Sequence, residues 1–439
     1  MRFGRTTGRP ATGLLVSAVV FLIAAAAIIH PVPAACAPQN PILRTVAFRT
    51  GPPDAIVVEG DSILGLSPGL NGSRTVSLPE GLHEFTLLAD GYVCGTSTVY
   101  VASDGAVVEA KLERARSSLR LVAVAPTSGR PKSVEFTPDG RYLAVAALSG
   151  PGVDILDPAT GRRILTLSPP EPYASYQGFV ETAFPVGRDE LWVTQMYSDS
   201  IHVFSLADWS YLRTIPSGGE FPKVLLAHPD GRVFVTHWLS STVCSIDPAT
   251  GLVLASIRTA DTPRGMALSP GAATLFVAGF GSGTIDVLDA ATLKRTTVLF
   301  DGKRGLPAGG TKRHLVVDPV RGRLYASDME RGSVFAVALD GYRLLAEIPV
   351  GQKNNTITLS PDGRWLYVST RGPNNAVDYE RKGPAFGEFL VIDTESLAVV
   401  ERHWGGNQPT GLAVSPDGRL VVFTDFLDHR VEVYSCGNR

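Results

Sequence analysis

The sequence predicts an all-β fold, in which a small β-sandwich precedes a seven-bladed β-propeller. Two recurring turn signals predict the propeller. The tetrapeptide PDGR stands between alternating apolar strands four times, at 138–141, 229–232, 361–364 and 416–419. A second signal recurs between these copies, as DPATG at 157–161 and 247–251, DAATL at 289–293 and DTESL at 393–397. Repeats of about 45 residues are typical of propellers and solenoids.

The PDGR segments have the chemistry of tight turns between antiparallel strands. Proline presets the first central position of a type I turn, aspartate bonds its own backbone, and glycine accepts the left-handed position that follows. Diverged copies keep the proline, as in FPVGRDELWVT, LSPGAATLFVA and VDPVRGRLYAS. We therefore count seven units, marked by Pro138, Pro185, Pro229, Pro270, Pro319, Pro361 and Pro416.

Each unit carries four strands, which we name a to d, and that is the content of one propeller blade. Strands a and b flank the PDGR turn, and strands c and d flank the second turn. The last unit ends after strand c, whereas a spare strand, SSLRLVAVAP at 117–126, precedes the first unit. We expect this spare strand to supply the outer strand of the last blade and to close the ring, which removes exposed strand edges.

The repeats resemble the YVTN-type, or YncE-like and surface-layer-type, β-propellers. The resemblance rests on LSPDGRWLYVST, VSPDGRLVVFTD and VCSIDPATGLVLASI, and it covers residues 117–439. It implies the fold, but it does not imply one activity, because propellers host many unrelated functions.

Residues 44–115 consist of short alternating strands separated by Gly, Pro and Asp turns, which predicts a separate small β-sandwich. The segment resembles a PEGA domain through Pro79-Glu80-Gly81, through Ala89-Asp90-Gly91-Tyr92 after the next strand, and through a closing AKLE. The resemblance implies a spacer or interaction module of an exported protein.

The first 36 residues have the order of an export signal. Three arginines precede the 16-residue apolar run 14–29, and small residues follow it. This order predicts a signal peptide or a membrane anchor. PAAC at 33–36 resembles a lipobox ending at Cys36, although Pro33 stands where an aliphatic residue is usual. Each interpretation predicts export to the periplasm or the cell surface, with membrane contact only through this segment.

Composition narrows the remaining function classes. The net charge of −2 gives no global basic character that would favour nucleic acid. The four cysteines form no CxxC or CxxCH motif, and Cys244 and Cys436 fall in blades that are not neighbours, so we expect no disulfide between them. HExxH, GxSxG and Walker A motifs are absent. We therefore expect no cofactor, no resident metal and no catalytic residues of these classes.

The repeat register yields the candidate site. Strand a of every blade lines the channel of a propeller, so equivalent residues converge near the axis. The residues six positions before each turn proline are mostly cationic, with Lys312 adding a charge beside Arg313; the series is Lys132, Phe179, Lys223, Arg264, Arg313, Asn355 and Thr410. Four cations at one channel mouth would focus a positive potential that attracts an anion.

The loops between strands b and c open at the same mouth. Their second residues form a mixed polar series in which two acids could partly neutralise the cations: Ala147, Gln195, His237, Gly279, Asp328, Arg371 and Asp425. We expect Trp238 and Phe280, one position further on, to pack between blades. Blade 6 has a long insertion at 371–389, which could cover the mouth and bring in Asp378, Tyr379, Arg381 and Lys382.

These observations favour an exported, monomeric, non-catalytic binding protein whose channel face engages an anionic small molecule, a glycan, a peptide or an envelope protein. Two alternatives stay open. One is a lactonase-type propeller enzyme, with a metal held by Asp328, Asp425, His237 and Asn355, although neighbouring cations would repel a metal. The other is a structural scaffold of the cell surface.

Overall fold

The computed structural model describes residues 41–437 except Asp54, 60–61, 68–71, Ser73, 90–91, 93–94, 113–118 and Pro384. The expected export segment, the lipobox at Cys36, Cys94 and the Asp90-Gly91 pair of the PEGA-like motif lie outside these residues. Among the described residues, no helix combines the length and the apolar character needed to cross a bilayer.

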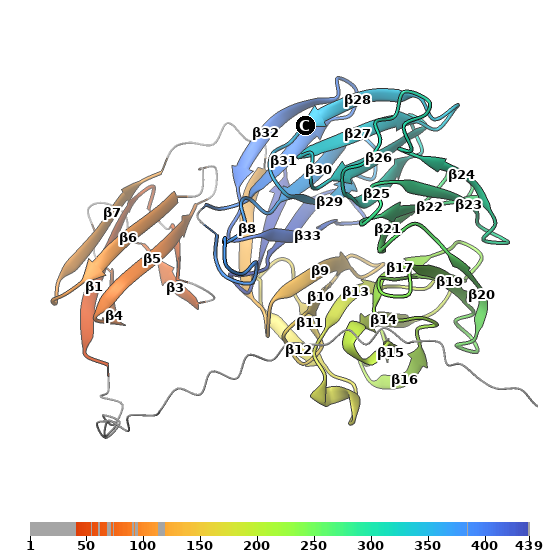
Figure 1. The fold of residues 1–439 in the computed structure, drawn as a ribbon. Helices are drawn as coiled ribbons and strands as arrows, with labels where there is room; N and C mark the ends of the chain where they lie inside the picture. The colour runs from red at the N-terminus through yellow and green to blue at the C-terminus, as the bar shows by residue number, and fades with distance from the viewer. Residues whose placement is uncertain are drawn as a thin grey trace, which may run out of the picture. The chain divides into compact units, whose positions relative to one another are not determined.

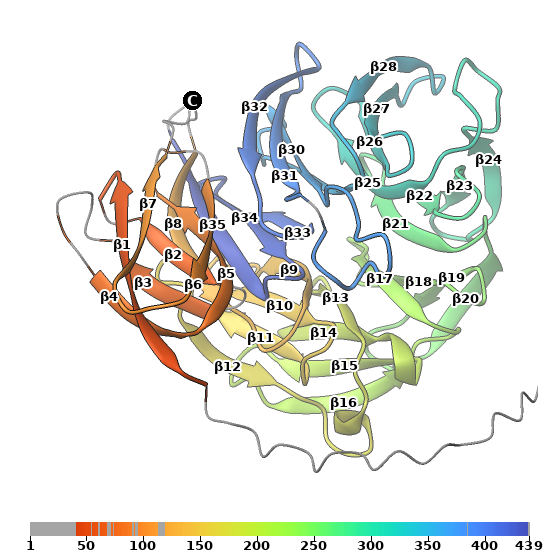
Figure 2. The same ribbon diagram turned by 60° about the vertical axis from the view of Figure 1, so that its left-hand side comes forward.

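Seven four-stranded antiparallel sheets confirm the propeller (Figure 1). The inner strands of the sheets contact one another in cyclic order, and the last contacts the first. Figure 2 shows the blades following one another around the ring. The strands of blades 1 to 4, with two short 3-10 helices in blade 2, are β9 (Pro131–Phe136), β10 (Leu143–Ala147), β11 (Val153–Leu156), β12 (Arg163–Leu167), η1 (Tyr173–Ser175), β13 (Phe179–Ala183), β14 (Glu190–Gln195), η2 (Met196–Ser198), β15 (Ser200–Ser205), β16 (Tyr211–Pro216), β17 (Pro222–Ala227), β18 (Val233–His237), β19 (Thr242–Ile246), β20 (Val253–Arg258), β21 (Pro263–Leu268), β22 (Thr274–Gly279), β23 (Ile285–Asp289) and β24 (Arg295–Leu299).

The last blade is shared between two parts of the chain, as expected. Strand β8, which precedes blade 1, pairs antiparallel with β35 and completes the sheet β33-β34-β35-β8. The strands of blades 5 to 7 are β25 (Lys312–Asp318), β26 (Arg323–Asp328), β27 (Ser333–Ala338), β28 (Leu344–Pro349), β29 (Asn354–Leu359), β30 (Trp365–Thr370), β31 (Glu388–Asp393), β32 (Ala398–Trp404), β33 (Pro409–Val414), β34 (Leu420–Asp425), β35 (Arg430–Cys436) and β8 (Leu119–Pro126).

The turn chemistry read from the sequence is present in the PDGR loops. In the first copy, Asp139 accepts hydrogen bonds from the Thr137 hydroxyl at 2.6 Å and from the Arg141 backbone N–H at 3.1 Å, while Gly140 has a φ of +71°. Between blades, the faces of the sheets bury apolar side chains, such as Val145 and Val422 in one cluster. Cys244 and Cys436 form no disulfide with each other, as expected.

The segment before the propeller forms two sheets, with strand orders β4-β1-β7 and β3-β2-β5-β6. They enclose one apolar core that includes Val46, Phe48, Phe85 and Val101. Gly81, in the Pro79-Glu80-Gly81 connection, has a φ of +148°, which only glycine adopts easily. The strands are β1 (Leu43–Gly51), β2 (Ile56–Glu59), β3 (Ser62–Leu66), β4 (Arg74–Pro79), β5 (Gly81–Leu88), β6 (Gly95–Val101) and β7 (Ala106–Lys111).

Candidate functional site in the propeller channel

Strand pairing fixes which residues are equivalent in the seven blades. In all seven blades, the first residue of the inner strand pairs with the last residue of strand b, and the register shifts next to this pair. The next residue faces the axis in the same register throughout. That series is Lys132, Val180, Lys223, Arg264, Arg313, Asn355 and Thr410.

This register corrects one residue of the predicted series. Phe179 pairs with Gln195, so it is equivalent to Pro222 in blade 3 and not to Lys223. Blade 2 has one residue fewer than the other blades between the start of its inner strand and its turn proline. Counting back six residues therefore lands one position too early, and Val180 takes the place.

Five cationic side chains form what we call the cation cluster: Lys132, Lys223, Arg264, Arg313 and Arg371. These side chains are close enough to repel one another. Burial lowers the pKa of Lys132 most, and repulsion from the other four side chains lowers it further. All except Lys132 are at most 9% exposed. Lys132, Arg264 and Arg313 line an axial cavity of about 70 Å³, which is large enough for a few waters or a small oxyanion.

Buried hydroxyl groups hold the inner strands in this register. In blade 3, Thr236 accepts the backbone N–H of Val224 at 3.1 Å and donates to the carbonyl of Arg264 in blade 4 at 3.1 Å. Each such hydroxyl thus links its own inner strand to that of the next blade. This hydroxyl relay consists of Thr194, Thr236, Ser327, Ser369 and Thr424.

No carboxylate lies within 4.0 Å of a cation of the cluster among the described residues. Lys223 instead lies 4.5 Å from the ring centres of both Phe221 and Trp238, and its Nζ is 3.0 Å from Met196 Sδ. Lys132 lies 4.6 Å from the ring centre of Phe426. Aromatic faces stabilise such cations only in part, so these contacts balance only part of the positive charge of the cluster.

Burial and mutual repulsion lower the pKa values of the cations. Burial, followed by repulsion from Arg264 and Arg313, lowers the pKa of Lys223 to about 6. Burial lowers the pKa of Arg264 and that of Arg371 to about 10. Burial, then Arg264 and Arg371, holds the pKa of Arg313 well below its ordinary value. The channel therefore disfavours the charges of its own side chains, which a bound anion would stabilise.

Two glutamates share the cavity with the cations. Burial raises the pKa of Glu181 to about 7, although Arg264, Arg313 and Lys132 oppose that rise. Burial, reinforced by Glu181, raises the pKa of Glu135 to about 8. His314 also lines the cavity, and burial beside Arg313 lowers its pKa to about 3, which keeps it neutral. The channel consequently holds more positive than negative charge at neutral pH.

A ring of mainly apolar side chains surrounds the channel mouth. Each member donates its backbone N–H to the carbonyl of the residue that directly precedes an inner strand. That residue stands two positions before the residue of the same strand that belongs to the axial series. Trp238 packs edge-on against Phe280, with ring centres 5.8 Å apart. We call this the mouth ring: Leu148, Met196, Trp238, Phe280, Met329, Arg371 and Phe426. Arg371 is its one charged member, and the equivalent of Gln195 or His237 in blade 6 is Thr370, not Arg371.

The blade 6 insertion reaches the neighbouring blades at this mouth. Glu380 forms an ion pair with Arg130 of blade 1 at 2.5 Å, and Lys382 forms one with Asp428 of blade 7 at 3.0 Å. The Tyr379 carbonyl accepts a hydrogen bond from Gln408, and its ring centre lies 5.6 Å from the Arg371 guanidinium. In Figure 2 the loop between β30 and β31 extends toward β33. Tyr379 is also close enough to Arg264 to influence its pKa.

Several other predicted site residues serve the blades rather than the channel. Asp328 pairs with Lys312 at 2.6 Å, and both are fully buried, so Lys312 does not join the cation cluster. Asp425 pairs with Arg430 at 2.9 Å. Because both carboxylates are bound to cations of their own blades, they do not neutralise the cluster, which corrects the expectation.

The remaining predicted residues also have partners within the fold. Gln195 donates to the carbonyls of Tyr173 and Tyr176, and His237 bonds the Ser217 carbonyl at 2.8 Å. Asn355 donates to the Pro409 carbonyl at 3.2 Å, and its buried Oδ1 has no hydrogen-bond partner in the described structure. The described residues contain no group of three or more His, Cys, Asp or Glu side chains placed to hold a metal ion.

Sequence reasoning missed the channel acids and the hydroxyl relay. The relay has a readable signal, because Thr or Ser stands in WVTQ, FVTH, YASD, YVST and VFTD at one repeat position. Glu135 and Glu181 gave no such signal, since the bulge in each inner strand alters which residues face the axis.

Comparison with known proteins supports this architecture. Antigen Lp49 of Leptospira interrogans serogroup Icterohaemorrhagiae serovar copenhageni (strain Fiocruz L1-130) is 38% identical over 324 residues, which cover 72% of this chain and 69% of that antigen. The chain belongs to the family of antigen Lp49. Residues 306–439 of this Lp49-family protein also match the family model described as "Lactonase, 7-bladed beta-propeller".

Two further similarities of this Lp49-family protein are more distant. A 6-phosphogluconolactonase of Sodalis glossinidius (strain morsitans) is 26% identical over 140 residues, 29% of this chain and 39% of that enzyme. A chain of Kuenenia stuttgartiensis hydrazine synthase superposes with a TM-score of 0.58 at 19% identity, covering 70% of this chain and 96% of that one. The latter likeness shows the fold alone.

Proposed function

We propose that this protein is an exported, non-catalytic binding protein whose propeller channel binds an anionic group of a small molecule, glycan, peptide or protein. One observation carries the proposal: the five basic side chains of the cluster converge near the axis without a carboxylate within 4.0 Å among the described residues. Buried charges in this state are costly, and an oxyanion in the adjacent cavity would bring them the missing partner.

The export part of the proposal rests on the N-terminal pattern of arginines, apolar run and small residues, and on the relative that is named as an antigen. We also propose that the repeats are of the YVTN type and that the first domain is a PEGA-like interaction module at the periplasmic or cell-surface side. In this arrangement the protein acts as a monomer, contacts the membrane through its N-terminal segment only and binds no nucleic acid.

The test is calorimetric titration of the full chain with sulfate, phosphate and citrate in low-salt buffer, beside thermal unfolding. We expect at least one of these anions to bind and to raise the midpoint, since a ligand of the folded state stabilises it by mass action. The double variant Lys223→Met/Arg264→Met should weaken binding at least 10-fold. The control Lys303→Met removes a lysine that is 76% exposed and should bind as the natural chain does. Equal binding in all three proteins, or no binding of any anion, would overturn the proposal.

A lactonase-type enzyme is the second candidate, and the match of residues 306–439 to the lactonase propeller model favours it. The relative named as a 6-phosphogluconolactonase suggests a phosphorylated lactone, which is itself an anion. The metal ligands expected from sequence are engaged elsewhere, as described for Asp328 and Asp425. Hydrolysis of 6-phosphogluconolactone by the full chain, assayed with and without added divalent metals, distinguishes the enzyme from the binding protein.

A further inference from the structure

A second, larger cavity lies at the other end of the propeller, between blades 1 and 2. It has a volume of about 650 Å³ and is formed by the a–b turns of both blades and the c–d turn of blade 2. Because b–c and d–a loops surround the channel mouth, these turns belong to the opposite face. Ligand pockets for small molecules have volumes of about 300–1,000 Å³, so this cavity is of the right size.

The walls of this cavity combine aromatic and polar side chains. Tyr142 and Trp209 meet edge to face, with ring centres 5.6 Å apart, and Phe184 adds a third aromatic wall. Trp209 has a φ of +63°, and the equivalent turn residues Leu293 and Tyr342 are left-handed too, so this conformation belongs to the c–d turn of the repeat and places the Trp209 ring at the cavity. Carboxylates and a guanidinium stand at the rim: Asp139, Arg141 and Asp189.

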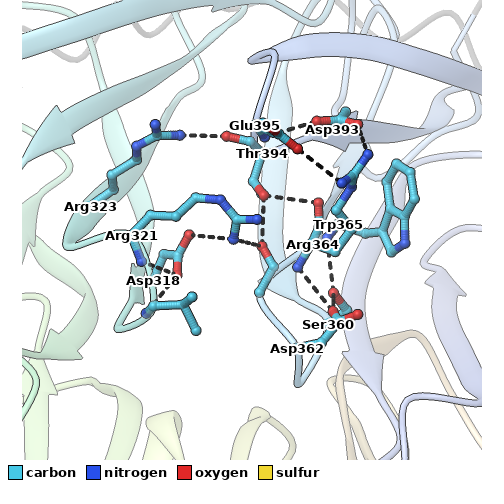
Figure 3. Close-up of polar contacts among 12 residues, drawn as sticks. Asp318, Arg321, Arg323, Ser360, Asp362, Arg364, Trp365, Asp393, Thr394 and Glu395 are labelled. Atoms are coloured by element: carbon cyan, nitrogen blue, oxygen red, sulfur yellow. Dashed lines mark hydrogen bonds and ion pairs between the residues drawn. The ribbon is translucent and has the colours of Figure 1, made fainter.

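Three other blade junctions, 2–3, 3–4 and 5–6, are bridged by an arginine at the equivalent place. At the blade 3–4 junction, Arg232 donates to the Ala290 carbonyl at 3.2 Å, and at the blade 5–6 junction Arg323 donates to the Thr394 carbonyl. Figure 3 shows the second case, together with Arg321, which reaches the Gly363 carbonyl at 2.8 Å. Hydrogen bonds from arginine therefore connect the c–d turn of one blade to the blade before it.

The blade 2–3 junction is also bridged by an arginine, which stands on a different strand. Arg213 donates to the Pro248 carbonyl at 3.0 Å and is held by Glu190. At the blade 1–2 junction, Tyr142 occupies the strand position that Arg232 and Arg323 occupy in blades 3 and 5. Tyr142 presents a ring here in place of a guanidinium: its hydroxyl accepts a hydrogen bond from Arg141 at 3.4 Å, and Trp209 packs against the ring.

From this comparison we propose that the blade 1–2 cavity is a binding site for a neutral sugar. Aromatic faces pack against the apolar C–H faces of sugar rings, and Tyr142, Phe184 and Trp209 offer such faces. Sugar hydroxyls both donate and accept hydrogen bonds; the rim carboxylates accept them, and Arg141 and the Trp209 indole N–H donate them. Because Arg188 is paired with Glu190 at 2.8 Å, the rim keeps Asp139, Asp189 and Arg141, a slight excess of negative charge, so the site does not select an anion as the channel does.

The experiment uses the full chain and an array of neutral oligosaccharides, followed by titration of the binders with tryptophan fluorescence as the readout. Trp209→Ala should weaken binding at least 10-fold. Tyr142→Arg should restore the arginine bridge of the other junctions, and so abolish binding while the unfolding midpoint stays within a few degrees. Tyr342→Ala is the matched control, because Tyr342 has the same left-handed conformation in blade 5, with a φ of +52°.

Lys223→Met should bind neutral sugars as the natural chain does, which separates this site from the channel. Failure of every neutral oligosaccharide on the array to bind would overturn the proposal. Binding that survives in both folded variants, Trp209→Ala and Tyr142→Arg, would overturn it as well, because the sugar would then lie elsewhere.

Discussion

Lys223 is buried among the sulfur of Met196 and the rings of Phe221 and Trp238, with no carboxylate close by. A lysine in such a place lowers the stability of the folded chain, because burial opposes its charge. Retention of a basic residue that destabilises the fold, at a convergent position, is the pattern expected of a binding site. The sequence register found this residue, since the repeat places Lys223, Arg264 and Arg313 at one position of three inner strands.

Lys223→Met should therefore make the unliganded protein more stable. Methionine has a similar volume and needs no counter-charge, so we expect the free energy of unfolding at pH 7 to rise by about 1–2 kcal/mol. Urea unfolding in anion-free buffer measures it. Lys303→Met, at an exposed position, should change the value by less than about 0.5 kcal/mol. A loss of stability in Lys223→Met would show that the contacts of the Lys223 side chain stabilise the unliganded fold.

The channel acids predict how anion affinity depends on pH. As the pH falls from 8.5 to 6, Glu135 and Glu181, with pKa values of about 8 and 7, lose their negative charge, and Lys223, with a pKa of about 6, begins to gain a positive one. Each change makes the channel more positive, so anion binding takes up protons. We expect sulfate, whose own charge is constant in this range, to bind about 10-fold more tightly at pH 6 than at pH 8.5.

Glu181→Gln is the informative variant for this pH dependence. It should bind sulfate more tightly than the natural chain at pH 8.5 and show a shallower pH dependence. Affinity that is independent of pH in both proteins would place the anion away from Glu181.

Among the elements, the blade 6 insertion lies where a loop can control access to the channel. Its two ion pairs, Glu380 with Arg130 and Lys382 with Asp428, attach it to the two blades that follow blade 6 around the ring. The sequence indicated the loop by its length. It could not indicate the partners, because Arg130 and Asp428 are distant in the chain and become neighbours only when the ring closes.

The double variant Glu380→Ala/Lys382→Ala should loosen the insertion without unfolding the blades. Partly exposed ion pairs contribute about 0–1 kcal/mol each, so the loss of stability should be small. If the insertion covers the bound anion, the dissociation rate should rise about 3–10-fold, as loops that gate a site set the rate of release. Stopped-flow measurement tests this, with the exposed Arg381→Ala as the control in the same loop. Unchanged release would show that the anion leaves by another route.

The strands also show the limits of register read from sequence. The turn residues locate every blade, because the tight turns need proline, aspartate and glycine for their backbone conformation. The count along blade 2 fails by one residue, and Arg371 is misplaced by one position in blade 6, since short and long connections shift the pairing without changing the apolar pattern. Strand pairing, which depends on the neighbouring strand, decides these positions.

For the whole molecule, closure of the ring depends on β8. Ala125 of this strand is fully buried opposite Val431, whereas Val122 is 41% exposed. Ala125→Glu would place an unpaired charge inside the last blade, and we expect a loss of about 3 kcal/mol or more in the free energy of unfolding. Val122→Glu on the same strand should cost less than about 0.5 kcal/mol. Equal effects of the two variants in urea unfolding would mean that the pairing of β8 with β35 does not stabilise the closed ring.

The shared last blade also determines where the ring can come apart. The chain runs from β8 in blade 7 directly into β9 in blade 1, so the boundary between these two blades is crossed by peptide bonds, as is every other boundary. The single covalent gap of the circle lies inside one blade, between β35 and β8, where a ladder of backbone hydrogen bonds spans it. Pulling two blades apart therefore stretches the backbone, and the circle opens only when one strand peels away from its neighbour.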